Sequence, residues 1–279
     1  MRRRESPGKP LQSVWDEIDG VRVHARVSSV AASETRPPII FVHGLGVSTR
    51  YMEPTMTRLA AEYPLAGLDL PGFGRSGSPK RTLDLPQLAD VLMAWLDARG
   101  LGPAIFVGNS FGCQVIVESV VRNPARAVGL VLNAPTMDPA HRTALGQILR
   151  VLADIPREPL SLAVHVARDY LRAGPLRLIA TLRTALADRI EEKLPHLVAP
   201  VAVVSGARDP VVTLRWAEEI TQLVGRERAD AAGALLQVVQ HAAHALPYDD
   251  PDTFAACIVA LYERRAAARP SVAGATPRG

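Results

Sequence analysis

The chain has 279 residues with a net charge of +4, and 48% of its residues are hydrophobic while 22% are charged. This composition is typical of an ordinary soluble globular protein, long enough for one large α/β domain with an inserted lid or for two small domains. No apolar run approaches the roughly 18 residues that cross a bilayer, and no signal segment follows the basic residues 2–4, so we expect a cytoplasmic protein without a membrane span.

The positive charge does not by itself indicate a nucleic-acid partner. Lysine occurs only at positions 9, 80 and 193, the arginines are interspersed with acidic residues, and no recognition motif accompanies them. The two cysteines, Cys113 and Cys257, show no metal-ligand spacing and no disulfide framework. We therefore expect no nucleic-acid partner.

Strands and helices alternate over the first half of the chain. Residues 1–12 have the composition of a disordered N-terminus. Residues 21–27 alternate apolar with polar or small side chains, which predicts an antiparallel edge strand. Continuous apolar runs predict buried strands, and helical patterns separate these runs. The strands are expected at 38–42, 65–70, 104–107 and 128–132, and the helices at 52–62, 85–99 and 113–121. This alternation predicts a doubly wound, mostly parallel α/β sheet.

From about residue 138 to 195 the pattern is helical only. We interpret residues 136–195 as a helical lid inserted between sheet strands, with a plain helical layer of the core as the alternative. Apolar residues follow one face of each of three helices, and we expect these faces to close a pocket for the substrate. The faces consist of Leu145, Ile148, Leu149 and Leu152; of Leu160, Val164, Ala167 and Leu171; and of Leu178, Leu182 and Leu186.

The alternation resumes after the lid. Strands are expected at 201–204 and 235–239, and a final helix at 251–264. Residues 267–279 have the composition of a disordered tail. The core of the fold is thus predicted at 13–135 and 196–266.

The pentapeptide Gly108-Asn109-Ser110-Phe111-Gly112 carries the strongest chemical information. It lies between an expected strand and an expected helix, with a serine at the apex of the turn. A serine hydroxyl becomes a useful nucleophile when it is held clear of the backbone, beside a base and near amide donors. The sharp turn brings the backbones so close that Gly108 and Gly112 are needed on either side. Ser110 is therefore the candidate nucleophile.

A base and an acid should follow two later strands, because reactive groups gather at the carboxyl ends of parallel strands. Asp209 follows the strand at 201–204, and His244 follows the strand at 235–239. Their order after Ser110 is that of a nucleophile–acid–base triad. His241 remains an alternative base, and Asp138 an alternative acid. We favour Asp209 because glycine and proline make a tight turn around it.

An oxyanion formed during acyl transfer needs two preorganised donors. One should be the amide of Phe111, directly after the nucleophile. The other should come from the loop His43-Gly44-Leu45-Gly46 that follows the strand at 38–42. Leu45 is the first candidate donor and Gly46 the second, while His43 is interpreted as structural.

Together these segments, with Asp69-Leu70-Pro71-Gly72-Phe73-Gly74-Arg75-Ser76, resemble the α/β-hydrolase fold superfamily over most of residues 14 to 264. The resemblance implies an eight-stranded sheet, a lid after the sixth strand, the triad named above, and neither a metal nor an organic cofactor. Cys113 stands where such proteins often carry a glycine, and we interpret it as a packing residue. An elbow serine argues against haloalkane dehalogenases and epoxide hydrolases, which use aspartate there.

We therefore expect a serine hydrolase that cleaves a small, mostly apolar ester, lactone or thioester through an acyl-enzyme, as a monomer or homodimer. The segment 109–112 also resembles hydrolases that cleave carbon–carbon bonds of ring-fission diketones, although Ala245-Leu246-Pro247 lacks their bulky residue after the histidine. A non-catalytic ligand-binding homologue is the third alternative. With an unperturbed histidine as base, activity should fall below about pH 6.5.

Overall fold

The computed structural model describes residues 10–267. Most of the segments expected to be disordered, 1–12 and 267–279, lie outside this range. Where the structure does describe the first segment, the expectation of disorder is wrong, because Leu11 is buried and Gln12 begins a strand. No helix within the described range is both long enough and apolar enough to cross a bilayer.

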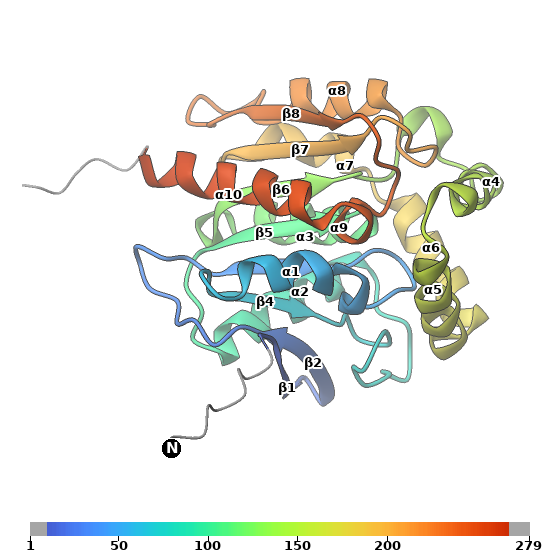
Figure 1. Cartoon of the computed structure of the whole chain (residues 1–279), viewed down its shortest axis with the longest axis horizontal. Coiled ribbons are helices and arrows are strands. Elements are labelled where there is room, and N and C mark those ends of the chain that lie inside the picture. Colours follow the sequence, from blue (N-terminus) through green and yellow to red (C-terminus); the bar gives the residue numbers. More distant parts are fainter. Residues whose placement is uncertain (1–9, 268–279) are drawn as a thin grey trace, which may run out of the picture.

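Eight strands of the described chain form one mixed, mostly parallel sheet (Figure 1), which confirms the predicted fold class. Their order across the sheet is β1-β2-β4-β3-β5-β6-β7-β8, with antiparallel pairing of β2 to both β1 and β4 and parallel pairing elsewhere. The strands are β1 (Gln12–Ile18), β2 (Val21–Val27), β3 (Ile39–Val42), β4 (Leu65–Leu68), β5 (Ala104–Asn109), β6 (Ala127–Asn133), β7 (Val201–Gly206) and β8 (Ala234–Val239).

Strand β1 was not predicted, and because of it β2 is not the edge strand of the sheet. Residues 21–27 do form a strand, but β1 pairs with it and takes the edge position. The two strands are joined by Asp19 and Gly20, both with positive φ, 48° and 74°. An Asp-Gly pair with these angles is the preferred two-residue hairpin turn. This turn was the available sequence signal, and the polar composition of β1 concealed it.

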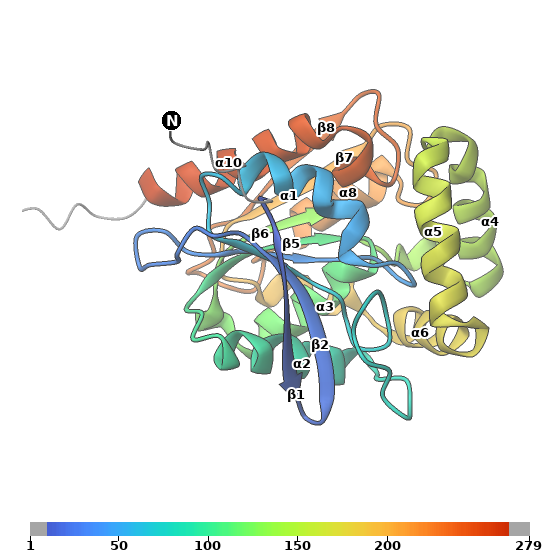
Figure 2. The same cartoon turned by 60° about the horizontal axis from the view of Figure 1, so that its bottom comes forward.

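Side chains of the central strands alternate between two apolar layers, because successive residues of a strand point to opposite faces. Helices α2 (Leu85–Ala98), α3 (Phe111–Arg122) and α8 (Leu214–Leu223) cover one face. Helices α1 (Glu53–Leu59), α9 (Leu246–Asp249) and α10 (Pro251–Ala267) cover the other. Figure 2 shows α1 and α10 on the side of the sheet opposite to α2 and α3. Both faces are therefore sealed, which explains the continuous apolar runs of the strands.

The helical insertion after the sixth strand is present as expected. Helices α4 (Ala144–Asp154), α5 (Leu160–Ala173), α6 (Pro175–Ala187) and α7 (Ile190–Lys193) lie between β6 and β7 in the chain. Both views place α4, α5 and α6 together at one end of the molecule (Figures 1 and 2). We refer to residues 139–196 as the lid.

The lid helices do not present their apolar faces as predicted. On α4 the side chains of the predicted face are 49–67% exposed, and on α5 Leu160, Val164 and Leu171 are 68–87% exposed. The buried side chains are instead Gln147 and Asp154 on α4, and Leu162 and Asp169 on α5. Of the three predicted faces, only that of Leu178, Leu182 and Leu186 on α6 packs against the core. The expectation that three apolar faces close a pocket is therefore wrong for α4 and α5.

Candidate active site

Ser110 lies at the tip of the turn between β5 and α3, with φ 56° and ψ −123°. A non-glycine residue rarely adopts such angles, and strain of this kind is typical of functional sites. The backbones around the turn are too close for side chains. A Cβ atom at Gly112 would lie 2.2 Å from the carbonyl oxygen of Val42, and one at Gly108 would lie 2.8 Å from the amide nitrogen of Cys113. The two glycines thus let the turn hold the serine at its apex.

Asp209 and His244 are in direct contact, although 35 residues separate them in the chain. The Nδ1 atom of His244 lies 2.8 Å from Oδ2 of Asp209, whose side chain is fully buried. The other carboxylate oxygen of Asp209 accepts hydrogen bonds from the amides of Val211 (2.7 Å) and Val212 (3.0 Å). With Nδ1 carrying the proton that bonds to Asp209, Nε2 of His244 is left as a proton acceptor.

The histidine segment also contacts the turn that carries the serine. Nδ2 of Asn109 donates to the carbonyl oxygen of His244 at 3.1 Å, and Oδ1 of Asn109 accepts from the hydroxyl of Tyr51 at 2.6 Å. That hydroxyl in turn accepts from the amide of Gly44 at 3.1 Å. A Cβ atom at Gly44 would lie 3.4 Å from Cβ of Ser110. The serine turn, the histidine segment and the loop after β3 therefore meet at one place.

The two alternative residues lie elsewhere. Nε2 of His241 contacts Oδ2 of Asp250 at 2.9 Å, and the His241 side chain is 70% exposed. Asp138 accepts from the amide of Ala140 at 2.8 Å, where it begins a short turn of helix. Neither residue takes part in the contact between Asp209 and His244.

The three predicted oxyanion donors have no acceptor within the described part of the protein. Among the hydrogen bonds of the described residues, none engages the amides of Leu45, Gly46 or Phe111. Phe111 is the first residue of α3, so its N–H has no acceptor within the helix. The amide of Gly44, in contrast, is already bonded to Tyr51. These contacts leave the three predicted donors available to a substrate oxygen.

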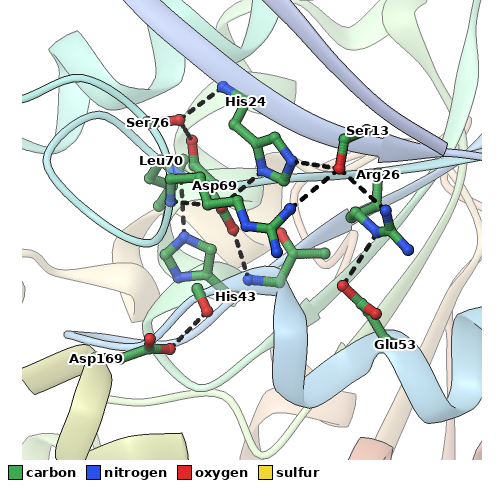
Figure 3. A network of polar contacts seen from close by, with 12 residues as sticks. Ser13, His24, Arg26, His43, Glu53, Asp69, Leu70, Ser76 and Asp169 are labelled. Carbon is green, nitrogen blue, oxygen red and sulfur yellow. Dashed lines mark hydrogen bonds and ion pairs between the residues drawn. The ribbon is translucent and has the colours of Figure 1, made fainter. Parts of the chain in front are cut away.

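A polar network braces the loop that carries Leu45 (Figure 3). Oδ1 of Asp69 accepts from the amide of Thr49, and Oδ2 of Asp69 accepts from the amide of Arg75 and from His24 Nδ1, each at 2.8 Å. Burial alone would raise the pKa of Asp69, but the hydrogen bonds from His24 and Arg75 help to lower it below its ordinary value. The ionised carboxylate therefore ties strand β2 to the loop after β3.

His43 and Cys113 are structural, in agreement with their interpretation from the sequence. Nε2 of His43 accepts from the amide of Leu70 at 2.9 Å, and Nδ1 lies 2.8 Å from the carbonyl oxygen of Gly44. Burial lowers the pKa of His43, so the ring stays neutral. The thiol of Cys113 is buried against the carbonyl oxygen of Asn133, and burial raises its pKa. Neither group is placed to react.

Two lid carboxylates beside His244 were not anticipated. Oε1 of Glu158 accepts from the amide of Ala245 at 2.7 Å, and burial raises the pKa of Glu158 to about 7. Burial also raises the pKa of Asp154, against the opposing effect of His244. Burial of the imidazole opposes its charge, but Asp209, Asp154 and Glu158 outweigh burial and raise the pKa of His244 to about 9. No sequence pattern connects these acids to the histidine, because the contact depends on how the lid folds back.

A third lid carboxylate, Asp169, contacts the loop after β3. Oδ2 of Asp169, on α5, accepts from the hydroxyl of Ser48 at 2.5 Å (Figure 3). Over residues 10–267 no group of three or more His, Cys, Asp or Glu side chains is arranged to hold a metal ion. The site as described is thus a set of hydroxyl, imidazole, carboxylate and amide groups beneath the lid.

Comparisons with known proteins agree with this architecture. Over 132 residues the chain is 34% identical to an abhydrolase domain-containing protein of Caenorhabditis elegans, which covers 44% of the chain and 29% of that relative. Three relatives that are more than 30% identical are spanned over only 29–40% of their own lengths.

Longer matches are more distant. The chain is 26% identical to a pimeloyl-[acyl-carrier protein] methyl ester esterase of Neisseria meningitidis serogroup B, over 78% of the chain and 90% of that enzyme. Among solved structures, a membrane phospholipase A matches with a TM-score of 0.77 at 19% identity, over 92% of the chain and 87% of that structure. At this identity the structural match shows the fold alone. The family model described as the alpha/beta hydrolase family matches residues 39–257, and the chain therefore belongs to the alpha/beta hydrolase family.

Proposed function

We propose that this chain is a serine hydrolase that cleaves a small, mostly apolar ester, lactone or thioester through an acyl-enzyme. The observation that carries the proposal is the contact of His244 Nδ1 with Asp209 Oδ2 at 2.8 Å, in a segment bonded to the residue before Ser110. A serine, a histidine and a buried aspartate on three separate loops are the groups that acyl transfer requires. The Neisseria relative, by its name, cleaves a methyl ester, which supports an ester among the possible substrates.

In the proposed mechanism the hydroxyl oxygen of Ser110 attacks the carbonyl carbon of the substrate. Nε2 of His244 takes the hydroxyl proton, and Asp209 stabilises the imidazolium that forms. The amides of Phe111 and Leu45, with Gly46 as the alternative donor, hold the oxyanion. His244 then gives the proton to the leaving alcohol or thiol. Water attacks the acyl-enzyme with His244 again as base, which releases the acid and restores Ser110.

The lid carboxylates modify this mechanism at the histidine. A base must be neutral to accept a proton, and Asp154 and Glu158 favour the charged imidazolium. They therefore stabilise the ion pair that forms when Ser110 is deprotonated, but they also keep part of the enzyme in its inactive protonated form below about pH 9. We infer that activity rises with pH over a higher range than an unperturbed histidine would give.

A fluorophosphonate probe tests the proposal directly, because it phosphonylates only activated serines. We expect an adduct on the peptide that contains Ser110, and no adduct in the His244→Ala variant. A panel of p-nitrophenyl esters of increasing chain length then ranks the acyl groups, and a ring-fission dienoate serves as the carbon–carbon substrate. An unlabelled native protein would contradict the proposal and favour the non-catalytic alternative. Turnover of the dienoate without ester hydrolysis would instead favour the alternative function, hydrolysis of a carbon–carbon bond.

A further inference from the structure

Apolar side chains are concentrated on the outside of the lid. Of the thirteen large hydrophobic side chains that are exposed among the described residues, eleven lie on α4, α5, α6 and the short turn after α4. Leu160, Leu171 and Leu176 are 83–87% exposed. The outer lid face comprises Leu145, Ile148, Leu149, Val151, Leu152, Ile155, Leu160, Val164, Leu171, Leu176 and Ile179. Monomeric proteins rarely leave large contiguous apolar areas in water, so a concentration of this size indicates a binding surface.

The spacing shows that these residues form coherent faces. On α4 they recur at positions 145, 148, 149 and 152, and on α5 at 160, 164 and 171, which is the repeat of one helix face. The opposite faces bury polar groups, among them Gln147 and Asp154. In an ordinary surface helix the apolar face is turned to the core. Helix α4 has the reverse orientation, and α5 buries Leu162 together with Asp169 while its longer apolar stripe faces outward.

The charges of the lid helices are sorted in the same way. Residues 144–187 contain three acidic side chains, and all three are turned to the core. Asp154 and Asp169 are 8% exposed, and Glu158 is bonded to the amide of Ala245. The exposed charged residues of this segment are all arginines: Arg157, Arg168, Arg172 and Arg183. The outer lid face therefore offers to solvent only apolar side chains and positive charge, besides small polar residues.

We infer that the outer lid face docks on the surface of a lipid bilayer that carries anionic headgroups. Apolar side chains would enter the boundary between headgroups and acyl chains, and the flanking arginines would contact the phosphates. This is the arrangement of amphipathic helices that lie in a membrane interface, where apolar burial and attraction to anionic lipid act together.

Two other occupants fit the face less well. A second copy of the chain would meet the same patch around a twofold axis, and because that patch exposes no acidic side chain, its arginines would gain no opposite charge across the contact. An acidic protein would satisfy the arginines, but it would need matching apolar side chains opposite leucines on three separate helices. A bilayer surface meets both requirements without directional contacts.

Docking of this face would hold the candidate active site next to the membrane. The inner side of the lid is bonded to the histidine segment through Glu158 and to the loop after β3 through Asp169. The binding itself does not depend on the proposed chemistry. A Ser110→Ala variant should bind vesicles as the native chain does, so that failure of one proposal is distinguishable from failure of the other.

Vesicle flotation tests the inference with the full chain. The probes are vesicles of phosphatidylcholine and vesicles of an equal mixture of phosphatidylcholine and phosphatidylglycerol. We expect the native chain to float with the mixed vesicles and to bind them less as salt is added. Replacing Leu160 and Leu171 together by serine should lower the partition coefficient about 10- to 100-fold, because two apolar groups no longer leave water.

The charge and the position are tested separately. Replacing Arg168 and Arg172 together by glutamine should lower partitioning into mixed vesicles about 30-fold and leave binding to pure phosphatidylcholine little changed. The matched controls outside the lid are Leu235→Ser, at a leucine that is 46% exposed, and Arg226→Gln, and both should bind as the native chain does. Circular dichroism melting checks that each variant is folded.

Three results would overturn the inference. The native chain could fail to float with either kind of vesicle, or the variant at Leu160 and Leu171 could float as well as the native chain. Sedimentation velocity could also reveal a dimer that this double variant converts to a monomer, in which case a second copy covers the face.

Discussion

The strands of the sheet and the helices of the lid use apolar residues in opposite ways. The central strands β3 and β5 are buried on both faces, and their aliphatic and aromatic side chains are 0% exposed. On α4 and α5 the apolar stripe faces water, while Gln147, Asp154 and Asp169 face the core. Period and composition thus identify an amphipathic helix, but they do not determine which of its faces is turned inward.

This difference has a consequence for the candidate site. A lid that buried its leucines would place an apolar surface over His244. The observed lid places two carboxylates there instead, and these raise the pKa of the histidine together with Asp209. The sheet therefore supplies the candidate reacting groups on rigid loops, and the lid adjusts their electrostatics.

The largest effect is expected at the proposed catalytic histidine. His244→Ala should lower kcat about 10⁴- to 10⁶-fold, because no other described side chain contacts Asp209 in a position to serve as the base. His241→Ala is the matched control three residues away, and its kcat should stay within about twofold of native. Ester hydrolysis with an active-site titration measures both. Equal losses in the two variants would contradict the assignment of the base.

The elements of the sheet were predictable because they obey local rules. Apolar runs predicted six of the eight strands, and Ser110 between two glycines predicted the turn between β5 and α3. The contact between Asp209 and His244 was predictable because each residue follows an apolar strand, so the topology brings both to the same edge of the sheet.

The features that were not predictable depend on long-range packing or on competing patterns. Strand β1 was missed because its alternation is mostly polar, although Asp19-Gly20 marks its turn. Asp154 and Glu158 could not be assigned to the site, because their contact with the histidine segment spans more than 80 residues of chain. Which side of α4 and α5 is turned to the core depends on the residues that the lid contacts. The sequence of either helix alone does not determine it.

Matched leucine substitutions sharpen the comparison between core and lid. Leu92→Ala on α2, where the side chain is 0% exposed, should lower the free energy of unfolding by about 2–5 kcal/mol, because it leaves a cavity. Leu171→Ala on α5, where the side chain is 84% exposed, should change it by no more than about 0.5 kcal/mol. Urea denaturation measures both. A loss above 2 kcal/mol at position 171 would show that the face is covered within the protein itself.

A smaller loss is expected from the bond between the lid and the loop after β3. Ser48→Ala removes the donor that lies 2.5 Å from Oδ2 of buried Asp169. A hydrogen bond to a charged group contributes about 1.5–3 kcal/mol, so the unfolding free energy should fall by that amount. The control is Ser161→Ala, at an exposed position on α5, the helix that carries Asp169. It should change the free energy of unfolding by less than about 0.5 kcal/mol. If the two variants are equally stable, the lid is not held by this contact.

The smallest effect tests whether the lid tunes the histidine. The pKa of His244 is raised to about 9, and only the neutral imidazole accepts a proton. Consequently kcat/KM should rise through neutral pH with its midpoint near pH 9 and level off above it, rather than with a midpoint near the value of about 6.5 for an unperturbed histidine. Because activity requires the loss of one proton from His244, kcat/KM should increase about tenfold per pH unit below the midpoint.

Glu158→Gln isolates the contribution of the lid. Glutamine retains an oxygen that can accept from the amide of Ala245, but it removes the negative charge near the imidazole. The pKa of His244 should therefore fall, the rising limb of kcat/KM should move to lower pH, and the rate at pH 7 should increase by up to about tenfold. Glu62→Gln, at an exposed position outside the lid, should leave the pH profile of kcat/KM unchanged. If the rising part of the kcat/KM profile does not move in Glu158→Gln, then the charge of Glu158 does not affect the pKa of His244. In that case the lid does not influence the candidate reacting groups through this charge.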